Sequence, residues 1–182
     1  MLTDKWEKGV LDFWFSELTP EQWYKKDDAV DRTITERFGA LHAAVATTDN
    51  AELAATRDMA LAAIIVLDQF ARNMFRGSAK SFAGDAKARA LSNAALEAEF
   101  DQAMNASEKQ FLYMPFMHSE TLCDQNRSVA LFEALGNENS LKYARMHREP
   151  IRLFGQFPHR NAMLDRPTSP AEQAWIDEHG GF

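Results

Sequence analysis

The sequence predicts an all-α protein, and three observations lead to that fold class. Gly and Pro, the residues least suited to helix interiors, number only 8 and 6 among 182 residues. Apolar side chains recur at the i, i+3/i+4, i+7 spacing of amphipathic helices along most of the chain. Capping residues (Ser, Thr, Asp, Asn) precede several of these stretches. We therefore expect eight or nine helices, with neighbouring antiparallel pairs stacked into a bundle or a superhelical array.

The first half of the chain is expected to hold four helices. The third has an apolar stripe, and the second is suggested by Pro at the first helical position. They begin after Thr3, at Thr19-Pro20-Glu21, near Asp28 and at about Ala51, the last running to Arg72.

The second half is punctuated by stronger capping signals, including S-x-x-Q and S-P-x-E patterns typical of capping boxes. The expected elements are a helix after the N-cap Asp85 to about Phe100, one opened by Ser107 with Gln110 and interrupted at Pro115, its continuation to Leu135, one from Asn139 or Ser140 to Phe154, and one from Ser169-Pro170 with Glu172 to near Gly180.

Length, charge and cysteine content limit the class of protein. A chain of 182 residues without a Gly/Ser/Pro-rich linker is expected to form one domain, residues 1–182. A net charge of −7 argues against nucleic-acid or anionic-membrane partners, which require a basic surface. The single cysteine, Cys123, forms no intramolecular disulfide and is expected to be buried, which suits the reducing cytoplasm. The longest apolar run, Met59–Leu67, spans about half a bilayer, so no membrane crossing is expected.

Three segments, residues 67–77, 111–125 and 154–161, hold more polar and aromatic side chains than helix packing requires. Polar groups on an apolar stripe must find partners, since each unpaired one costs about 1–3 kcal/mol. One interpretation is structural: Asp68 pairs with Arg72 or Arg160, Asp124 pairs with Arg127, and Gln125 is satisfied internally. The Arg-Asn dipeptides in the first and third segments would then tie helix ends to loops.

The other interpretation is a ligand site formed by the same segments. Histidine beside carboxylates supplies acid–base chemistry near neutral pH, and arginine binds carboxylate or phosphate. His118 and Glu120 would lie about 160° apart on one helix, which opposes a shared site unless Pro115 distorts that turn. The candidate ligand-binding residues are Arg72, Asn73, His118, Glu120, Asp124, His147, His159, Arg160 and Asn161.

No motif assigns a cofactor or a metal. The sequence holds no H-E-x-x-H pattern, Walker loop, G-x-G-x-x-G or G-x-S-x-G. We therefore expect neither a metal site nor a bound cofactor, and we assign no catalytic residue.

Long motifs nonetheless resemble a known family. They are LDFWF (11–15), Trp23-Tyr24, IIVLDQFARNMFRG (64–77), FAGDAKA (82–88), FLYMPFMHSE (111–120), DQNRSVALF (124–132) and FGQFPHRN (154–161). They span nearly the whole chain and resemble the uncharacterised bacterial family Domain of Unknown Function 924. The resemblance implies a TPR-like right-handed α–α superhelix and no established activity. Ala71 stands where the family usually has proline, which should straighten the helix there.

Three functions follow as hypotheses. The leading one is a binding module that holds a peptide or small polar ligand on a TPR-like scaffold. The second is an enzyme acting on a small anionic metabolite, with His118 or His159 as acid–base and Arg160 as anion clamp. The third is a structural protein that works through homo-oligomer contacts.

Overall fold

Helices follow one another along residues 2–181, the part of the chain that the computed structural model describes, and no β-strand occurs among these residues. The α-helices are α1 (Trp6–Asp12), α2 (Asp28–Thr47), α3 (Asn50–Leu53), α4 (Arg57–Ile64), α5 (Ala71–Met74), α6 (Asp85–Glu97), α7 (Ala106–Met117), α8 (Leu122–Leu135), α9 (Glu138–Phe154) and α10 (Pro170–His179). Since α4 and α5 belong to one continuous helical segment, the described residues contain nine helices, as expected.

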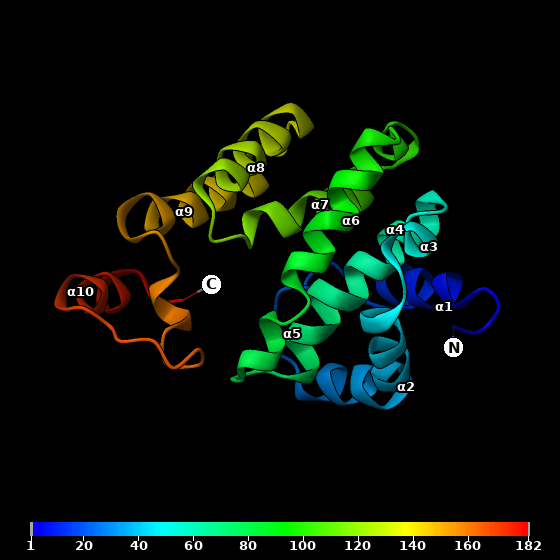
Figure 1. Ribbon diagram of the computed structural model, residues 1–182, viewed down its shortest axis with the longest axis horizontal. Helices are drawn as coiled ribbons and strands as arrows, with labels where there is room; N and C mark the ends of the chain where they lie inside the picture. The colour runs from blue at the N-terminus through cyan, green and yellow to red at the C-terminus, as the bar shows by residue number, and fades with distance from the viewer. Residues whose placement is uncertain (1, 182) are drawn as a thin grey trace.

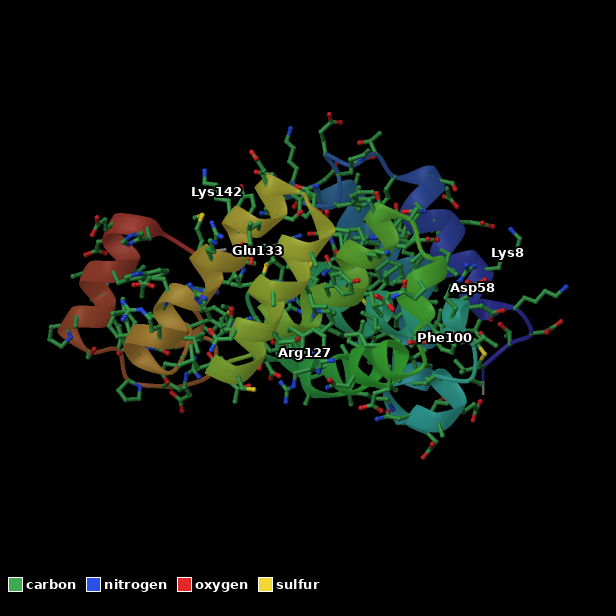
Figure 2. The ribbon with its side chains drawn as sticks, turned by 90° about the horizontal axis from the view of Figure 1, so that it is seen from above. Lys8, Asp58, Phe100, Arg127, Glu133 and Lys142 are labelled. Atoms are coloured by element: carbon green, nitrogen blue, oxygen red, sulfur yellow. The ribbon has the colours of Figure 1, made fainter. Side chains whose placement is uncertain are left out.

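The N-terminal helices lie in one half of the molecule and the C-terminal helices lie in the other. Figure 1 shows α1 and α2 in one half and the pair α8 and α9 in the other, with α10 at the far end. Viewed from above, Lys8 and Asp58 lie in the first half, and Glu133 and Lys142 lie in the second (Figure 2). After α10 the chain turns back, and Gly181 lies against His159, where an added Cβ would be 3.3 Å from the His159 Cβ.

An aromatic cluster joins the N-terminal helices. Phe70 packs against Phe38 of α2 at a centroid distance of 4.8 Å and against Trp14 at 5.6 Å. Phe13 lies 5.1 Å from Phe38, and Phe111 of α7 lies 5.3 Å from Trp14. Such pairs add about 0.5–1.5 kcal/mol each to the burial of their surface. This cluster fixes the helical segment that carries Asp68.

The prediction of a single helix from Ala51 to Arg72 is wrong. Asp49 caps the short α3, and Thr56 caps α4 by accepting from the amide of Met59. The backbone then widens into a π-helical stretch, η2 (Ile65–Phe70), and continues into α5. π-Helical turns are uncommon and frequently occur at functional sites. The helical backbone runs through Ala71.

The helix expected to continue past Pro115 to Leu135 is wrong too. Pro115 lies inside α7, which ends at Met117, and residues 118–121 form a connection before α8. Gln125 stabilises this break, because its buried side-chain amide donates to the carbonyls of Met117 (2.6 Å) and Ser119 (2.8 Å). His118 and Glu120 therefore do not share a regular helix, and the expected angle between them does not apply.

Smaller expectations also need correction. Residues 20–24 form turns rather than a helix, and Cys123 is exposed near the start of α8 rather than buried. Asn105 with Glu108 forms the capping box of α7 in place of Ser107 with Gln110. Three other boundaries move by one to three residues: Gly84 precedes α6, which begins at Asp85 and ends at Glu97, and Asn137 caps α9. The start of α2 and the Ser169–Glu172 capping box of α10 are confirmed.

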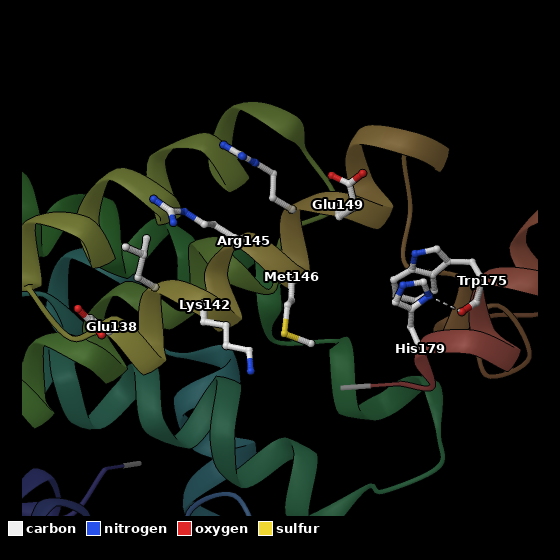
Figure 3. A pocket seen from close by; sticks show the side chains of 9 residues that line it. Glu138, Lys142, Arg145, Met146, Glu149, Trp175 and His179 are labelled. Atoms are coloured by element: carbon white, nitrogen blue, oxygen red, sulfur yellow. Dashed lines mark hydrogen bonds between the residues drawn. The ribbon is translucent and has the colours of Figure 1, made fainter.

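Two surface features complete the fold. Within residues 2–181, no helix combines the length and apolar character needed to cross a bilayer. An open groove of about 680 Å³ lies between α9 and the end of α10 (Figure 3).

Candidate functional site

Asp68 is the buried centre of a polar cluster. Its side chain is fully buried in η2, where it accepts from Gln69 Nε2 at 2.5 Å and from Arg72 Nη1 at 3.0 Å. Burial alone would raise the pKa of this carboxyl. The neighbouring charge of Arg72 and the hydrogen bond from His118 outweigh it and hold the pKa of Asp68 below its ordinary value. Asp68 is therefore a buried carboxylate at neutral pH.

His118, at the C-terminal end of α7, is oriented by Asp68. Its Nδ1 lies 2.7 Å from Oδ1 and 3.0 Å from Oδ2 of the carboxylate. Burial and the positive charge of Arg72 lower the pKa of His118, although Asp68 acts in the opposite direction. A neutral imidazole that donates from Nδ1 carries its lone pair on Nε2. That atom has no hydrogen-bond partner among the described residues, and the side chain remains 12% exposed.

Arg72 links Asp68 to a second carboxylate on α6. Its guanidinium donates from Nη1 and Nη2 to the two oxygens of Asp85, each at 3.0 Å. The approach of α6 to η2 depends on Gly84, where an added Cβ would lie 2.6 Å from the carbonyl oxygen of Leu67. A residue without a side chain at this position thus allows Asp85 to reach Arg72.

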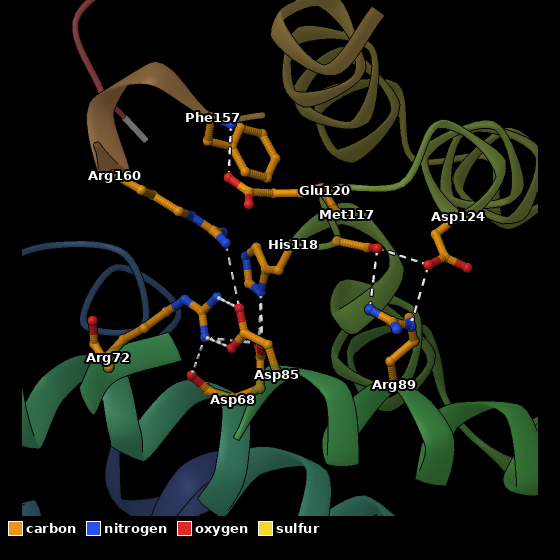
Figure 4. A network of polar contacts seen from close by, with 12 residues as sticks. Asp68, Arg72, Asp85, Arg89, Met117, His118, Glu120, Asp124, Phe157 and Arg160 are labelled. Carbon is orange, nitrogen blue, oxygen red and sulfur yellow. Dashed lines mark hydrogen bonds and ion pairs between the residues drawn. The ribbon is translucent and has the colours of Figure 1, made fainter. Parts of the chain in front are cut away.

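Arg160 lies on the opposite side of His118 from Asp68 (Figure 4). Its guanidinium is sandwiched between the rings of Phe82 (4.5 Å) and Phe157 (4.4 Å), with Nη1 3.5 Å from Asp85. Only 7% of the side chain is exposed, and its buried Nε has no hydrogen-bond partner among the described residues. Burial and the charge of Arg72 lower the pKa of Arg160 to about 10, so it remains charged at pH 7. The cluster thus contains a cation with an unused donor.

Two further histidines border this region. The ring of His147 on α9 lies 6.0 Å from that of His118, and its Nδ1 donates to the carbonyl of Tyr143 at 2.8 Å. Burial lowers the pKa of His147 to about 3. Burial and the charge of Arg160 lower the pKa of His159 to about 4. Both are neutral imidazoles at pH 7 and therefore add no charge to the cluster.

Glu120 and Asn161 hold the connection after α9 to the rest of the molecule. Glu120 accepts from both terminal nitrogens of Arg166 (2.7 and 2.9 Å) and from the amide of Phe157 (2.8 Å). Burial would raise the pKa of Glu120, but these donors lower it below its ordinary value. Asn161 donates to Pro167 and Glu172 and accepts from Arg166. All these contacts fix the segment that places Arg160.

The remaining candidate residues lie outside the cluster. Asp124 does not pair with Arg127, because α8 begins only at Leu122 and its first turn faces α6. It contacts Arg89 at 3.2 Å and accepts from Ser119 at 2.7 Å. Asn73 donates to Asp31 at 2.7 Å, so it ties α5 to α2.

The structure thus brings together Arg72, His118, His147, His159 and Arg160, and it selects Arg72 as the arginine partner of Asp68. Sequence reasoning did not place Asp85 or Phe82 in the site, and it did not assign a partner to Arg166. The FAGD segment at residues 82–85 contained a signal, since an aromatic residue, a small Gly and an acid precede a helix without any packing pattern to explain them. Arg166 lies in a connection with no periodicity, so its partner could not be assigned.

The chemistry of the cluster is that of proton transfer and anion binding. Three arginines (Arg72, Arg160, Arg166) balance three carboxylates (Asp68, Asp85, Glu120), while the neutral His118 offers a lone pair. No group of three or more His, Cys, Asp or Glu side chains suited to a metal ion occurs among residues 2–181.

The fold and cluster together define an all-helical protein whose central helices carry a buried carboxylate–histidine–arginine network. Residues 10–180 match the family described as "Bacterial protein of unknown function (DUF924)", and the chain belongs to this family. The solved structure of the protein of unknown function ATU0120 from Agrobacterium tumefaciens is similar, with 36% sequence identity and a TM-score of 0.89. That similarity covers 94% of this chain and 97% of the other. No curated protein matches the sequence.

Proposed function

We propose that this protein binds a small anionic molecule between His118 and Arg160, and that His118 acts there as a general base. The observation that supports this proposal most directly is the contact between His118 Nδ1 and Asp68 at 2.7 Å. With Nδ1 engaged by the carboxylate, Nε2 of His118 has no hydrogen-bond partner among the described residues. A buried carboxylate that orients an imidazole is a recurrent arrangement for general bases. Burying the charge of Asp68 costs desolvation free energy, and buried ion pairs are weak contributors to stability. This cost also supports a functional role for the carboxylate.

Arg160 supplies the anion-binding half of the proposal. Its position between two aromatic rings fixes the guanidinium plane, and its Nε is a buried donor without a partner among residues 2–181. A carboxylate or phosphate oxygen would satisfy this donor, because the guanidinium fork matches both groups. The ligand class is therefore a small molecule bearing one of these groups.

The proton step follows from the charge states of the cluster. A bound O–H or N–H group would give its proton to Nε2 of His118, and the resulting imidazolium would be stabilised by ionised Asp68. The proton would return to the product or to water when the ligand leaves. A neutral histidine at pH 7 is the form required for the first transfer.

The wider features of the chain fit a small-molecule protein of the cytoplasm. Its net charge of −7 and single cysteine support this location. The TPR-like right-handed superhelix implied by the family resemblance is part of the same proposal, and the adjacent packing of α7, α8 and α9 supports it.

A thermal-unfolding screen with small anions tests the proposal. We expect at least one of inorganic phosphate, acetate, succinate and glycerol phosphate to raise the melting temperature by several degrees. A ligand present at 100 times its Kd adds about 2.7 kcal/mol, and each kcal/mol is worth about 2–4 °C in a domain of this size.

The variant Arg160→Lys should remove this shift, because it keeps the charge but lacks Nε and the planar fork. Arg152→Lys is the matched control, since Arg152 is an exposed arginine paired with Glu149 on α9. Some anions stabilise proteins by exclusion from the surface. Equal shifts in wild type, Arg160→Lys and Arg152→Lys would therefore contradict a site at Arg160.

A binding module and an enzyme differ in what happens to the bound molecule. If NMR spectra of a stabilising ligand remain unchanged over hours with the protein, binding without turnover is supported. If the ligand is converted, His118→Gln should abolish the conversion while Arg160 still binds.

A specific observation also favours a structural role for part of the network. The hydrogen bonds that Glu120, Arg166 and Asn161 form within residues 2–181 join them to one another and to residues 157–172. We assign these residues to the structure of the site rather than to its ligand. Glu120→Gln should accordingly lower stability, and it should weaken anion binding less than Arg160→Lys does, because Glu120 positions the segment of Arg160 and makes no contact with the ligand itself.

A further inference from the structure

The outer face of α9 carries apolar side chains that nothing in the described chain covers. Tyr143, Met146 and Leu153 are 47%, 38% and 48% exposed. The opposite face of the same helix is buried through Ala144, His147 and Ile151. Contiguous exposed apolar groups on one helix mark interaction surfaces more often than isolated ones do.

This face borders the groove of about 680 Å³ between α9 and the end of α10. Figure 3 shows Lys142, Met146 and Glu149 projecting from α9, with Trp175 and His179 across the groove on α10. The rings of Trp175 and His179 stack at a centroid distance of 4.7 Å with an interplanar angle of 12°. An aromatic pair thus forms one wall and a helix with exposed apolar groups forms the other.

The groove is locally basic on an acidic protein. Lys142, Arg145 and Arg148 line it with two acids, Glu138 and Glu149, for a local charge of +1 against −7 for the whole chain. Glu149 is already paired with Arg152, outside the groove. Neither Lys142 nor Arg148 forms an ion pair with another described residue. Arg145 pairs with Glu133 at 3.3 Å, so Lys142 and Arg148 are the bases available to an acidic partner.

We propose that this groove binds an acidic amphipathic helix of another protein. Lys142, Met146, Glu149 and Leu153 are spaced i, i+4, i+7 and i+11, so they form one stripe along α9. A partner helix could pack apolar residues on Met146 and Leu153 while its acids meet Lys142 and Arg148. This is the helix-in-groove mode of recognition, in which apolar anchors supply affinity and charges supply specificity.

The proposal is independent of the anion site. No residue that lines the groove belongs to the Asp68–His118–Arg160 cluster. Variants in the groove should therefore leave the response of the protein to small anions unchanged, and failure of one proposal does not affect the other.

The test uses fluorescence anisotropy with the full chain and a fluorescein-labelled helical peptide. The peptide has leucine at i, i+4, i+7 and i+11, glutamate at the positions that flank the leucine stripe and alanine elsewhere, which keeps it helical. A second peptide replaces every glutamate with lysine. We expect saturable binding of the glutamate peptide, and a Kd for the lysine peptide that is at least about tenfold higher. Raising the salt concentration should weaken the binding of the glutamate peptide, because its charges are solvent-exposed at the groove rim.

Matched variants locate the binding surface. Met146→Glu and Lys142→Glu should each raise the Kd of the glutamate peptide by about tenfold or more. Lys25→Glu makes the same change as Lys142→Glu, and Leu122→Glu replaces an apolar side chain with a charge as Met146→Glu does. Both positions are exposed and do not line the groove, so both variants should leave the Kd unchanged.

Three outcomes would overturn the proposal. The two peptides could bind equally well, or the groove variants could bind like their controls. The third is a dimer of the 20.6 kDa chain by light scattering that Met146→Glu converts to a monomer, which would assign the face to a second copy.

Discussion

His118 donates from Nδ1 to Oδ1 of Asp68 at 2.7 Å, although the histidine lies 50 residues later in the chain. One partner belongs to a π-helical stretch and the other to a helix end, so neither side chain is held by an ordinary helical repeat. The pair is oriented by the surrounding fold and in turn fixes the imidazole tautomer. We regard it as the centre of the proposed site.

Removing Asp68 should destabilise the protein substantially. Asp68→Ala leaves Arg72 and His118 without their shared acceptor, and loss of one member of a buried pair costs about 3–5 kcal/mol. We expect the lower part of that range, because Arg72 keeps both hydrogen bonds to Asp85. Urea unfolding monitored by circular dichroism measures the change. An unaltered unfolding midpoint would show that the pair contributes nothing to the folded state.

Gly84 should tolerate no side chain. In Gly84→Ala the new Cβ would lie 2.6 Å from the carbonyl oxygen of Leu67, so α6 must move away from η2. We expect a loss of about 1–3 kcal/mol, as for other overpacked positions. Gly39→Ala is the control: Gly39 lies in α2 with nothing within 4 Å of an added Cβ, and alanine there should stabilise by about 0.5–1 kcal/mol. If both substitutions changed the free energy of unfolding in the same direction, this account would be contradicted.

Stability should fall as the pH is lowered below about 6.5. Folding lowers the pKa of His147 to about 3 and that of His159 to about 4, from an ordinary value of 6.5. The unfolded chain therefore binds these protons first. The stability they contribute is complete above pH 6.5 and is lost as the pH falls toward the folded values, at about 1.4 kcal/mol per pH unit for each histidine.

Urea unfolding at a series of pH values measures this slope. His147→Gln removes one of the two groups and should reduce the slope by about 1.4 kcal/mol per pH unit. If plots of unfolding free energy against pH are parallel for wild type and His147→Gln between pH 6 and 4.5, His147 does not titrate as proposed.

His159→Ala should leave stability nearly intact. The His159 side chain is only partly buried, beside Phe157, and if it serves the site its removal should cost less than about 1 kcal/mol. Anion affinity measured by thermal shift should weaken in the same variant. A loss of several kcal/mol would instead mean that His159 supports the fold.

The sequence predicted the all-helical fold and several helix ends, but it did not predict the π-helical stretch, the break before α8 or the site. The reasons are physical. Helical spacing and caps depend on local interactions, so α2 and α10 could be placed from Asp28 and the Ser169–Glu172 box. The π-helical stretch depends on tertiary packing, because Phe38 and Trp14 hold Phe70 from other helices. Periodicity at 100° per residue cannot represent such a stretch.

The break before α8 was missed for a related reason. Pro115 was expected to interrupt a helix after one or two turns, but α7 runs from Ala106 to Met117 and contains Pro115 in its last turn. The break occurs three residues later, where Gln125 satisfies the carbonyls of Met117 and Ser119. Only after this break is known can His118 be placed beside Asp68 and Glu120 beside Arg166.

The most direct test of the central claim is NMR of the histidine side-chain nitrogens, with His118 assigned by comparison with His118→Gln. At pH 7 we expect a neutral imidazole with the proton on Nδ1, and a shift of Nε2 when inorganic phosphate or the best anion from the thermal screen is added to wild type. The same addition should leave the chemical shift of Nε2 unchanged in Arg160→Lys. A His118 that is protonated at pH 7, carries its proton on Nε2, or is unaffected by every anion tested would contradict the account.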